Sequence, residues 1–414
     1  MPLLGLRLAV LLLVIFNIPG LPSVSERFHE IATSAGVPYR DFPVEYPIGE
    51  LALIKVIGPW APDVARTLLA LVAFAADIVA FAAIRAGWGK GAARRYLVLG
   101  LPLLLFIYRR ADLASVALAV LGLALLERKR EKSGGATLAV ATLVKLWPGV
   151  LLPAVFIRRR FQGAWTYAIT LAAGMLVWVV IGGPSAISQV VTFRGSTGWE
   201  VESTVGTIVW AATGEQRFEQ GAARTGSIPS WFAVATVLLL LTGLGAIWRR
   251  AAIRGLEPAG APALAAVAML LVTSSLLSPG YMAWLLPWGA IASERQKRWA
   301  WLTFVPCLLT AVLVAKWNLL IPHLRGQAWS QALLLLRNLS LLAILLGWLF
   351  AGSGTPSVVS RAVDVTGSSD PPLGRSSPRP KPGASTRSAT ADTASSADRQ
   401  SAARPPAAGE RSPT

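Results

Sequence analysis

The chain has 414 residues, of which 54% are hydrophobic and 14% charged, with a mean hydropathy of +0.55. This composition excludes an ordinary soluble domain and is typical of a protein with many membrane-spanning helices. The net charge of +18 would suit nucleic-acid binding, but Lys and Arg gather in short loops between apolar runs, so we expect no nucleic-acid partner. A single cysteine, Cys307, excludes a disulfide within the chain.

The first apolar run, residues 3–18, is predicted to be an uncleaved membrane helix. No Lys or Arg precedes the run, Arg7 lies inside it, and no small-residue cleavage site follows it.

Later apolar runs fall into two length classes. A helix needs roughly 20 apolar residues to cross a bilayer, and several runs reach that length: 61–84, 164–181, 231–248 and 331–350. The runs at 96–108 and 281–292 are shorter and interrupted, which favours a bundle with an internal cavity. Residues 138–156 are predicted to form two short helices that turn at residues 145–148, because one crossing there would put a strongly basic loop outside.

Positive charge recurs between the spans, and the positive-inside rule places these clusters in the cytoplasm. The five clusters are Arg85/Lys90/Arg94/Arg95, Arg128/Lys129/Arg130/Lys132, Arg158/Arg159/Arg160, Arg249/Arg250/Arg254 and Arg295/Lys297/Arg298. We therefore expect an all-α polytopic protein of the cell membrane with about twelve crossings and both termini in the cytoplasm. Residues 1–350 form this domain, and residues 351–414, rich in Pro, Ser and Arg, are predicted to be a disordered cytoplasmic tail.

The remaining loops fall on the extracytoplasmic side and hold most of the polar chemistry. The first, residues 36–47 (GVPYRDFPVEYP), carries Arg40, Asp41, Glu45 and Tyr46 between prolines that disfavour a regular helix. Its carboxylates suit a general base or a ligand for substrate hydroxyls. An ion pair at the membrane interface, for instance with Arg40, is the alternative.

Other outer-loop residues suit proton transfer or phosphate binding. His323 is a candidate for proton transfer because its ordinary pKa is about 6.5. The candidates for gripping a phosphate are Arg109, Arg110, Lys145, Arg194, Lys316 and Arg325, each of which has lipid-headgroup contact as its alternative. Arg337, within the last span, needs a polar cavity or partner. The sequence contains no nucleotide-binding, zinc or serine-hydrolase motif, so no metal is expected.

Four segments in this order carry a resemblance to a known family. They are residues 36–47, residues 143–148 (LVKLWP), residues 200–203 (EVES) and residues 277–287 (LSPGYMAWLLP). With the hydropathy profile, they resemble the polyprenol-phosphate-dependent membrane glycosyltransferases of glycosyltransferase family 87, in the GT-C superfamily. Most of these are actinobacterial mannosyltransferases. Two positions depart from the family pattern: Ile48 stands where a second proline is usual, and Gly280 where glutamine is common.

The resemblance implies sugar transfer at the extracytoplasmic face, with inversion at the anomeric carbon. The donor would be polyprenyl-phosphate-mannose as co-substrate, with no further cofactor, and the acceptor a glycolipid or lipoglycan of the cell envelope. Asp41 is the preferred base over Glu45 and His323, and cations such as Lys145 and Arg194 would stabilise the departing phosphate. The remaining implied substrate-binding residues are Arg40, Tyr46, Arg109, Arg110, Asp112, Trp147, Glu200, Glu202, Ser203, Tyr281, Lys316 and Arg325.

Three questions stay open from the sequence: which sugar the donor carries, whether the protein is a transporter, and whether it is a scaffold. The donor sugar is mannose, arabinose or glucose. A polar-lipid flippase or transporter would also need a cavity and outward charges, although no internal repeat supports a transporter. A membrane scaffold without catalysis is the third alternative.

Overall fold

The computed structural model describes residues 2–16, 23–192, 196–315 and 327–350. The chain divides into two units, Met1–Val358 and Val359–Thr414, and every described residue belongs to the first. The predictions for the tail and for Arg194, Lys316, His323 and Arg325 therefore lie outside the described residues.

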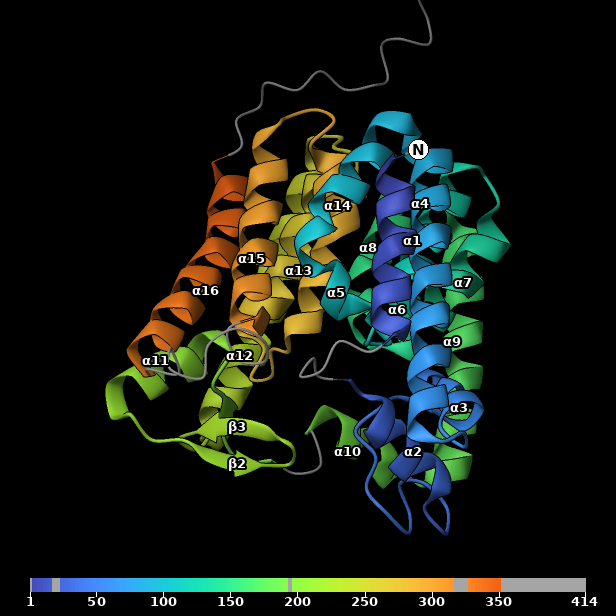
Figure 1. Cartoon of the computed structure of the whole chain (residues 1–414). Coiled ribbons are helices and arrows are strands. Elements are labelled where there is room, and N and C mark those ends of the chain that lie inside the picture. The colour runs from blue at the N-terminus through green and yellow to red at the C-terminus, as the bar shows by residue number, and fades with distance from the viewer. Residues whose placement is uncertain (1, 17–22, 193–195, 316–326, 351–414) are drawn as a thin grey trace, which may run out of the picture. The chain divides into compact units, whose positions relative to one another are not determined.

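The described part is mostly helical (Figure 1). Five stretches in it are long and apolar enough to cross a membrane: Pro62–Ile107 (α4, η1 and α5), Phe161–Gly182 (α9), Ser230–Ile253 (α12), Arg298–Ala315 (α15) and Ala328–Leu349, within α16 (Gln327–Leu349). Shorter apolar helices are α1 (Pro2–Ile15), η2 with α8 (Trp147–Ile157), α11 (Thr204–Thr213) and α13 (Ala261–Thr273). The other helices are α2 (Ser25–Thr33), α3 (Ile48–Ile57), α6 (Asp112–Glu127), α7 (Glu131–Val144), α10 (Ser185–Val191), η3 (Pro279–Leu285) and α14 (Leu286–Ala292).

Two breaks divide the helical runs where the sequence predicted turns. At a rise of 1.5 Å per residue, the 46 residues of Pro62–Ile107 would measure about 69 Å, twice a bilayer core of about 30 Å. Gly89, with φ 94° and ψ 176°, breaks α4 (Pro62–Leu99) inside this run. In residues 138–156, α7 ends at Val144, because Pro148 cannot donate a hydrogen bond to the Val144 carbonyl.

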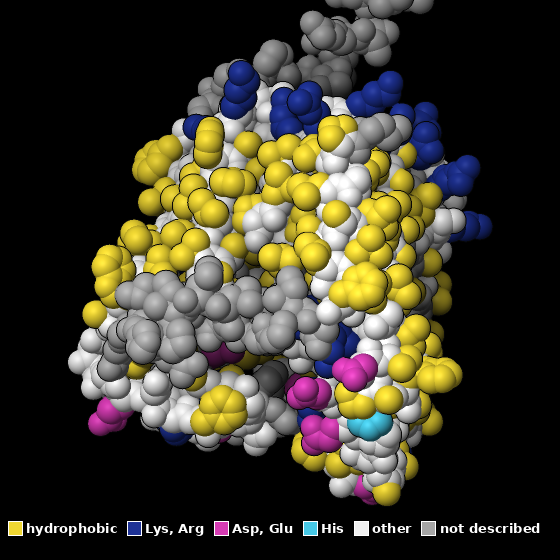
Figure 2. All heavy atoms as spheres, in the orientation of Figure 1, with side chains coloured by type: hydrophobic (Ala, Val, Ile, Leu, Met, Phe, Trp, Pro, Cys, Tyr) yellow, Lys and Arg dark blue, Asp and Glu magenta, His cyan; other side chains and the backbone are white. Residues whose placement is uncertain are grey.

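Basic residues mark one end of the bundle, the upper end in Figure 2. The acidic side chains visible in Figure 2 lie toward the opposite end. Arg160, before α9, is 3.2 Å from Glu131 at the start of α7. Arg158, after α8, pairs with Glu127 at the end of α6 and with Glu257 before α13. Since these ion pairs bring the start of α7 and the end of α8 together, residues 131–157 leave and return to the same end. The hairpin predicted from the sequence is therefore confirmed.

The opposite end carries α2, α3, α10 and a small antiparallel sheet (Figure 1). The sheet has the order β1 (Trp199–Glu200), β3 (Ala222–Thr225), β2 (Arg217–Glu219). Trp199 pairs with Thr225, and Arg217 pairs with Arg224. The all-α prediction describes the bundle but omits this sheet, because its short polar strands lack the alternating apolar pattern of a recognisable strand.

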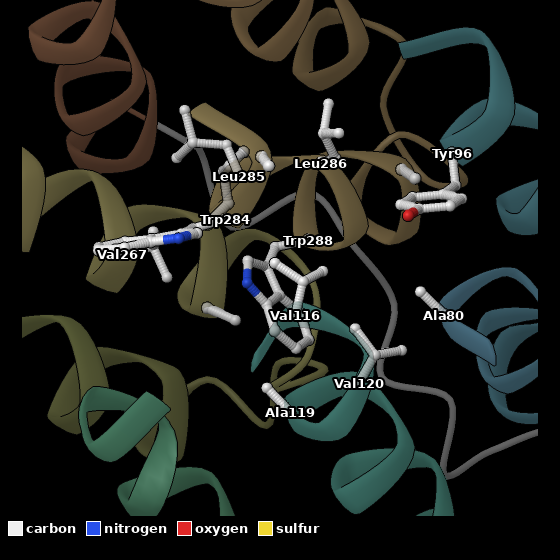
Figure 3. Close-up of a cluster of buried hydrophobic side chains, with 14 of the residues drawn as sticks. Ala80, Tyr96, Val116, Ala119, Val120, Val267, Trp284, Leu285, Leu286 and Trp288 are labelled. Atoms are coloured by element: carbon white, nitrogen blue, oxygen red, sulfur yellow. The ribbon is translucent and has the colours of Figure 1, made fainter. Parts of the chain in front are cut away.

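A core of small and large apolar side chains lies between α4, α6, α13 and α14 (Figure 3). Ala80 and Ala119 allow close helix approach, and the large side chain of Trp288 is fully buried in the same cluster. In a bilayer, where helix association depends on packing, small residues at such contacts bring backbones close together. Trp284, at the edge of this core, also bonds the Asp112 carboxylate, so the core adjoins the polar residues described in the next section.

Candidate active site

Lys145 stands at the break between two short helices and faces the start of α3. Its backbone is extended, with φ −144° and ψ 135°, and its Nζ lies 2.9 Å from Glu50 Oε2. Gly49 makes this possible, because a Cβ there would lie 2.8 Å from the backbone of Leu143. The Lys145 ammonium also lies 5.4 Å from the centroid of the Tyr46 ring, within the range of a cation–π contact.

Burial dominates the ionisation of this pair. It raises the pKa of Glu50 to about 7, with the nearby Asp112 carboxylate adding to the rise and Lys145 opposing it. Burial also opposes the charge on Lys145, but the carboxylates of Glu50 and Asp112 outweigh it and raise the pKa of the ammonium. Lys145 is therefore a permanent cation, and Glu50 can change its protonation state near neutral pH.

Asp112 begins α6 and joins this pair to the Ser-Pro-Gly-Tyr turn. Its Oδ1 accepts a hydrogen bond of 3.1 Å from Trp284 Nε1. A Cβ on Gly280 would lie 2.6 Å from Asp112 Oδ2, so the backbone of the turn approaches the carboxylate directly. A side chain at position 280 would therefore require the Asp112 carboxylate to move.

An aromatic wall covers one side of the cluster. Trp284 stacks on Tyr281, with ring centroids 4.0 Å apart, and on Trp147, with centroids 5.2 Å apart. Trp147 Nε1 donates to Ser115 Oγ at 2.9 Å, which fixes its ring. Trp147 and Trp284 are buried, so the half-buried Tyr281 is the ring of this stack that a sugar could contact.

Arg110 brings a second cation to the same turn. Its Nη2 donates to Ser278 Oγ at 2.9 Å, and its guanidinium lies over the Phe106 ring. The adjacent Arg109 is buried, with 2% of its side chain exposed.

Glu200 and Glu202 form a buried acidic pair beside this turn. Glu200 Oε2 accepts from the Leu277 amide at 2.7 Å, and burial together with Glu202 raises the pKa of Glu200 to about 7. Glu202 Oε2 lies 2.8 Å from Arg337 Nη1, so this acid is the partner that Arg337 requires inside α16. Ser203 caps α11: its Oγ accepts from the Gly206 amide at 3.0 Å and donates to the Glu200 carbonyl at 2.8 Å.

The first outer loop is held by contacts of its own. Asp41 is exposed, and its Oδ2 accepts from the Val37 amide at 2.5 Å within the loop. Glu45 forms a two-point ion pair with Arg27 at 3.0 and 2.8 Å, and Arg40 donates to the Val180 carbonyl at 2.7 Å. The loop therefore brings Tyr46 to Lys145, while the hydrogen bonds described for Asp41 stay within the loop.

Sequence reasoning overlooked two members of the cluster. Glu50 had a visible signal, since it is a carboxylate in the mostly apolar helix α3, where Lys55 is the other charged residue. Trp284 lies in the segment 277–287 that carries the family resemblance, but it was not singled out, because one tryptophan among 16 in a membrane protein is usually an interfacial residue.

The long apolar helices and the separation of charge between two ends define an integral membrane protein. The sequence profile of glycosyltransferase family 87 matches residues 44–279, more than half of the chain. The chain therefore belongs to glycosyltransferase family 87 and is a membrane glycosyltransferase. A search among curated proteins found no match. The matched range contains Glu50, Asp112, Lys145, Glu200 and Glu202, and Asp41 lies just before it.

Proposed function

We propose that the protein transfers a hexose, mannose by preference, from a polyprenyl-phosphate-sugar donor to a glycolipid or lipoglycan acceptor of the cell envelope. The observation that carries the proposal is the cluster of Lys145, Glu50, Asp112, Tyr281 and Trp284 within and beside the region that matches the family. It combines a cation for a phosphate, carboxylates for sugar hydroxyls and flat aromatic faces for a sugar ring.

The proposed topology places this cluster on the extracytoplasmic side. Basic side chains gather at one end of the bundle (Figure 2), and the positive-inside rule assigns that end to the cytoplasm. Helix α7 starts beside Arg160 at that end, and Lys145 follows its far end. We propose about twelve passes between the ends, several of them short, and the breaks at Gly89 and Lys145 support this topology. Both termini then belong to the cytoplasm, and the cell membrane is the proposed location.

The proposed reaction is a single displacement with inversion. An acceptor hydroxyl oxygen attacks the anomeric carbon, the bond from that carbon to the phosphate oxygen breaks, and a carboxylate takes the hydroxyl proton. The electron pair leaves with the polyprenyl phosphate, whose growing negative charge Lys145 and Arg110 stabilise. Lys316, Arg194 and Arg325 remain proposed phosphate contacts from the sequence.

Two carboxylates compete for the role of base. The sequence favours Asp41, whereas the structure supports Asp112. The Asp112 carboxylate lies close enough to Lys145 to raise the pKa of the ammonium, and among its described contacts it bonds one neutral donor, Trp284 of the aromatic wall. We assign the role to Asp112, with Asp41, Glu45 and His323 as the residues to be tested against it. Glu50, Glu200 and Glu202 then orient sugar hydroxyls.

The test uses membranes that contain the full chain, labelled polyprenyl-phosphate-mannose and envelope glycolipids. Asp112→Asn is expected to lower the transfer rate about 10²–10⁴-fold, and Asp41→Asn much less. A wild-type protein that transfers no sugar from any polyprenyl-phosphate donor would contradict the transferase. If Asp41→Asn alone abolishes transfer, the base is Asp41 and the assignment to Asp112 is wrong.

A further inference from the structure

A second polar site lies at the basic end, far from Lys145 along the bundle. It is a pocket of about 280 Å³ where α12, α13, α14, α15 and α16 meet. Three arginines line it, Arg250, Arg254 and Arg295, together with Trp299 and Trp348. The proposed transfer reaction uses none of these residues.

Cations outnumber acids among the described residues that line the pocket. Glu257 is the carboxylate among its lining residues, and that carboxylate is already paired with Arg158. Arg250 is held in place, since its Nη1 donates to the Leu349 carbonyl at 2.8 Å and its guanidinium lies 5.3 Å from the Trp348 ring centroid. Three guanidinium groups gathered at one pocket favour the binding of an anion.

The pocket also offers a hydrogen-bond acceptor. Gln296 lines it, and the Gln296 Oε1 atom is buried without a hydrogen-bond partner among the described residues. A ligand with a hydroxyl group beside its anionic group would satisfy this oxygen.

Its position in the fold favours a lipid over a soluble anion. The candidate spans Ser230–Ile253 and Ala328–Leu349 end at the pocket, and Arg298–Ala315 begins there, so the arginines stand at the level of lipid headgroups. The inner wall is apolar, with Leu256 and Ile291. On the outside, α12 exposes large apolar side chains such as Ile253, 67% exposed. The phosphate group of a phospholipid can bind the arginines while the acyl chains of the same lipid follow α12 into the bilayer.

We propose that this pocket binds the phosphate headgroup of an anionic glycerophospholipid with free hydroxyl groups. The arginines contact the phosphate, Gln296 Oε1 accepts from a headgroup hydroxyl, and Trp299 and Trp348 close the apolar side. The site stands apart from sugar transfer and does not depend on it.

The test measures binding of short-chain phosphatidylglycerol to the full chain in neutral detergent by native mass spectrometry. The wild type is expected to bind it in preference to phosphatidylcholine. Arg250→Gln/Arg295→Gln is expected to weaken binding about thirty-fold, since each arginine near the bilayer surface contributes on the order of five-fold. The matched control, Lys129→Gln/Arg130→Gln, removes the same charge from another pocket at the same end and is expected to leave binding unchanged.

Three results would overturn the proposal. They are equal weakening by both double variants, equal binding of phosphatidylcholine, and equally tight binding of glycerol 3-phosphate, which would make the site one for soluble phosphates. If the double arginine variant fails to fold, Gln296→Glu serves instead, because it adds a negative charge without removing an arginine. It is expected to weaken phosphatidylglycerol binding, and unchanged binding would also refute the site.

Discussion

Two buried ion pairs in this protein differ in how completely the charge of the cation is balanced by the carboxylates around it. Arg7 of α1 lies 3.1 Å from Asp77 of α4, and each side chain is 1% exposed. Asp77 also accepts from Tyr96 at 2.6 Å and Tyr108 at 2.7 Å. One cation meets one carboxylate whose oxygens are bonded to neutral donors. This cluster is closed, and it holds α1 against α4.

The pair of Lys145 and Glu50 has the same charges but a different setting. Lys145 is 16% exposed and Glu50 2%, and a second carboxylate, Asp112, adjoins them. Burial raises the pKa of Glu50 to about 7 even beside the ammonium. A partly accessible cation among surplus acids can bind and release charged ligands, whereas the Arg7 cluster can only stabilise. The comparison therefore separates a structural ion pair from the pair that we propose to be functional.

The largest expected effect is on stability, at the closed pair. Arg7→Met leaves the Asp77 carboxylate buried and without its cation, which is expected to cost about 3–5 kcal/mol. Thermal unfolding in detergent measures the loss, and the transfer activity of the remaining folded protein should be unchanged. The control is Arg66→Met, which breaks an ion pair of 3.0 Å whose acid, Asp63, is 86% exposed, and it should cost less than about 1 kcal/mol. If Arg7→Met and Arg66→Met lose equal stability, the Arg7–Asp77 pair contributes no more than an exposed ion pair, and the comparison fails.

The open pair should respond in activity instead. Lys145→Met is expected to lower kcat/KM about 10²–10³-fold, because it removes a cation from the proposed leaving phosphate. Its stability should fall less than that of Arg7→Met, since Glu50 can take up a proton once the ammonium is gone. The control is Lys55→Met, on the same helix as Glu50, which loses only bonds of 3.3 Å to backbone carbonyls. A rate for Lys145→Met equal to that of Lys55→Met would refute the role.

The smallest expected effect is on the pH dependence of stability, through Glu200. Its pKa is raised from 4.5 to about 7, so between these values the folded protein binds a proton that the unfolded chain has lost. Its contribution to stability is therefore lost as the pH rises from 4.5 to about 7. Glu200→Gln is expected to reduce the slope of the melting temperature against pH in this window, while Glu50, whose pKa is also raised to about 7, keeps part of it.

A second acid on the same sheet provides the control for Glu200. Although slight burial opposes it, the bonds of Glu219 with the Thr197 amide and Arg217 lower the pKa of Glu219. Glu219→Gln should therefore change the profile only at acid pH, where the contribution of Glu219 is lost as the pH falls. An unchanged slope between pH 4.5 and 7 in Glu200→Gln would show that this acid is not buried as described.

Local sequence features predicted the helical bundle and several positions of the candidate site. Length and hydropathy predicted the long helices, and Pro148 with the flanking basic loops predicted the hairpin at Lys145. The motif around Ser278 drew attention to Tyr281, which packs against Trp284. These features depend on neighbouring residues alone, since helix length, proline geometry and loop charge act within a few positions.

The pairing of charges was decided by the tertiary structure. Lys145 finds Glu50 because Gly49 lets α3 approach α7, and Arg337 finds Glu202, 135 positions away in the chain. The sequence by itself determined a membrane-embedded glycosyltransferase of family 87 type with acids and cations in its loops. Only the fold decided which acid meets which cation, because that choice depends on helix packing across the bundle and not on spacing along the chain.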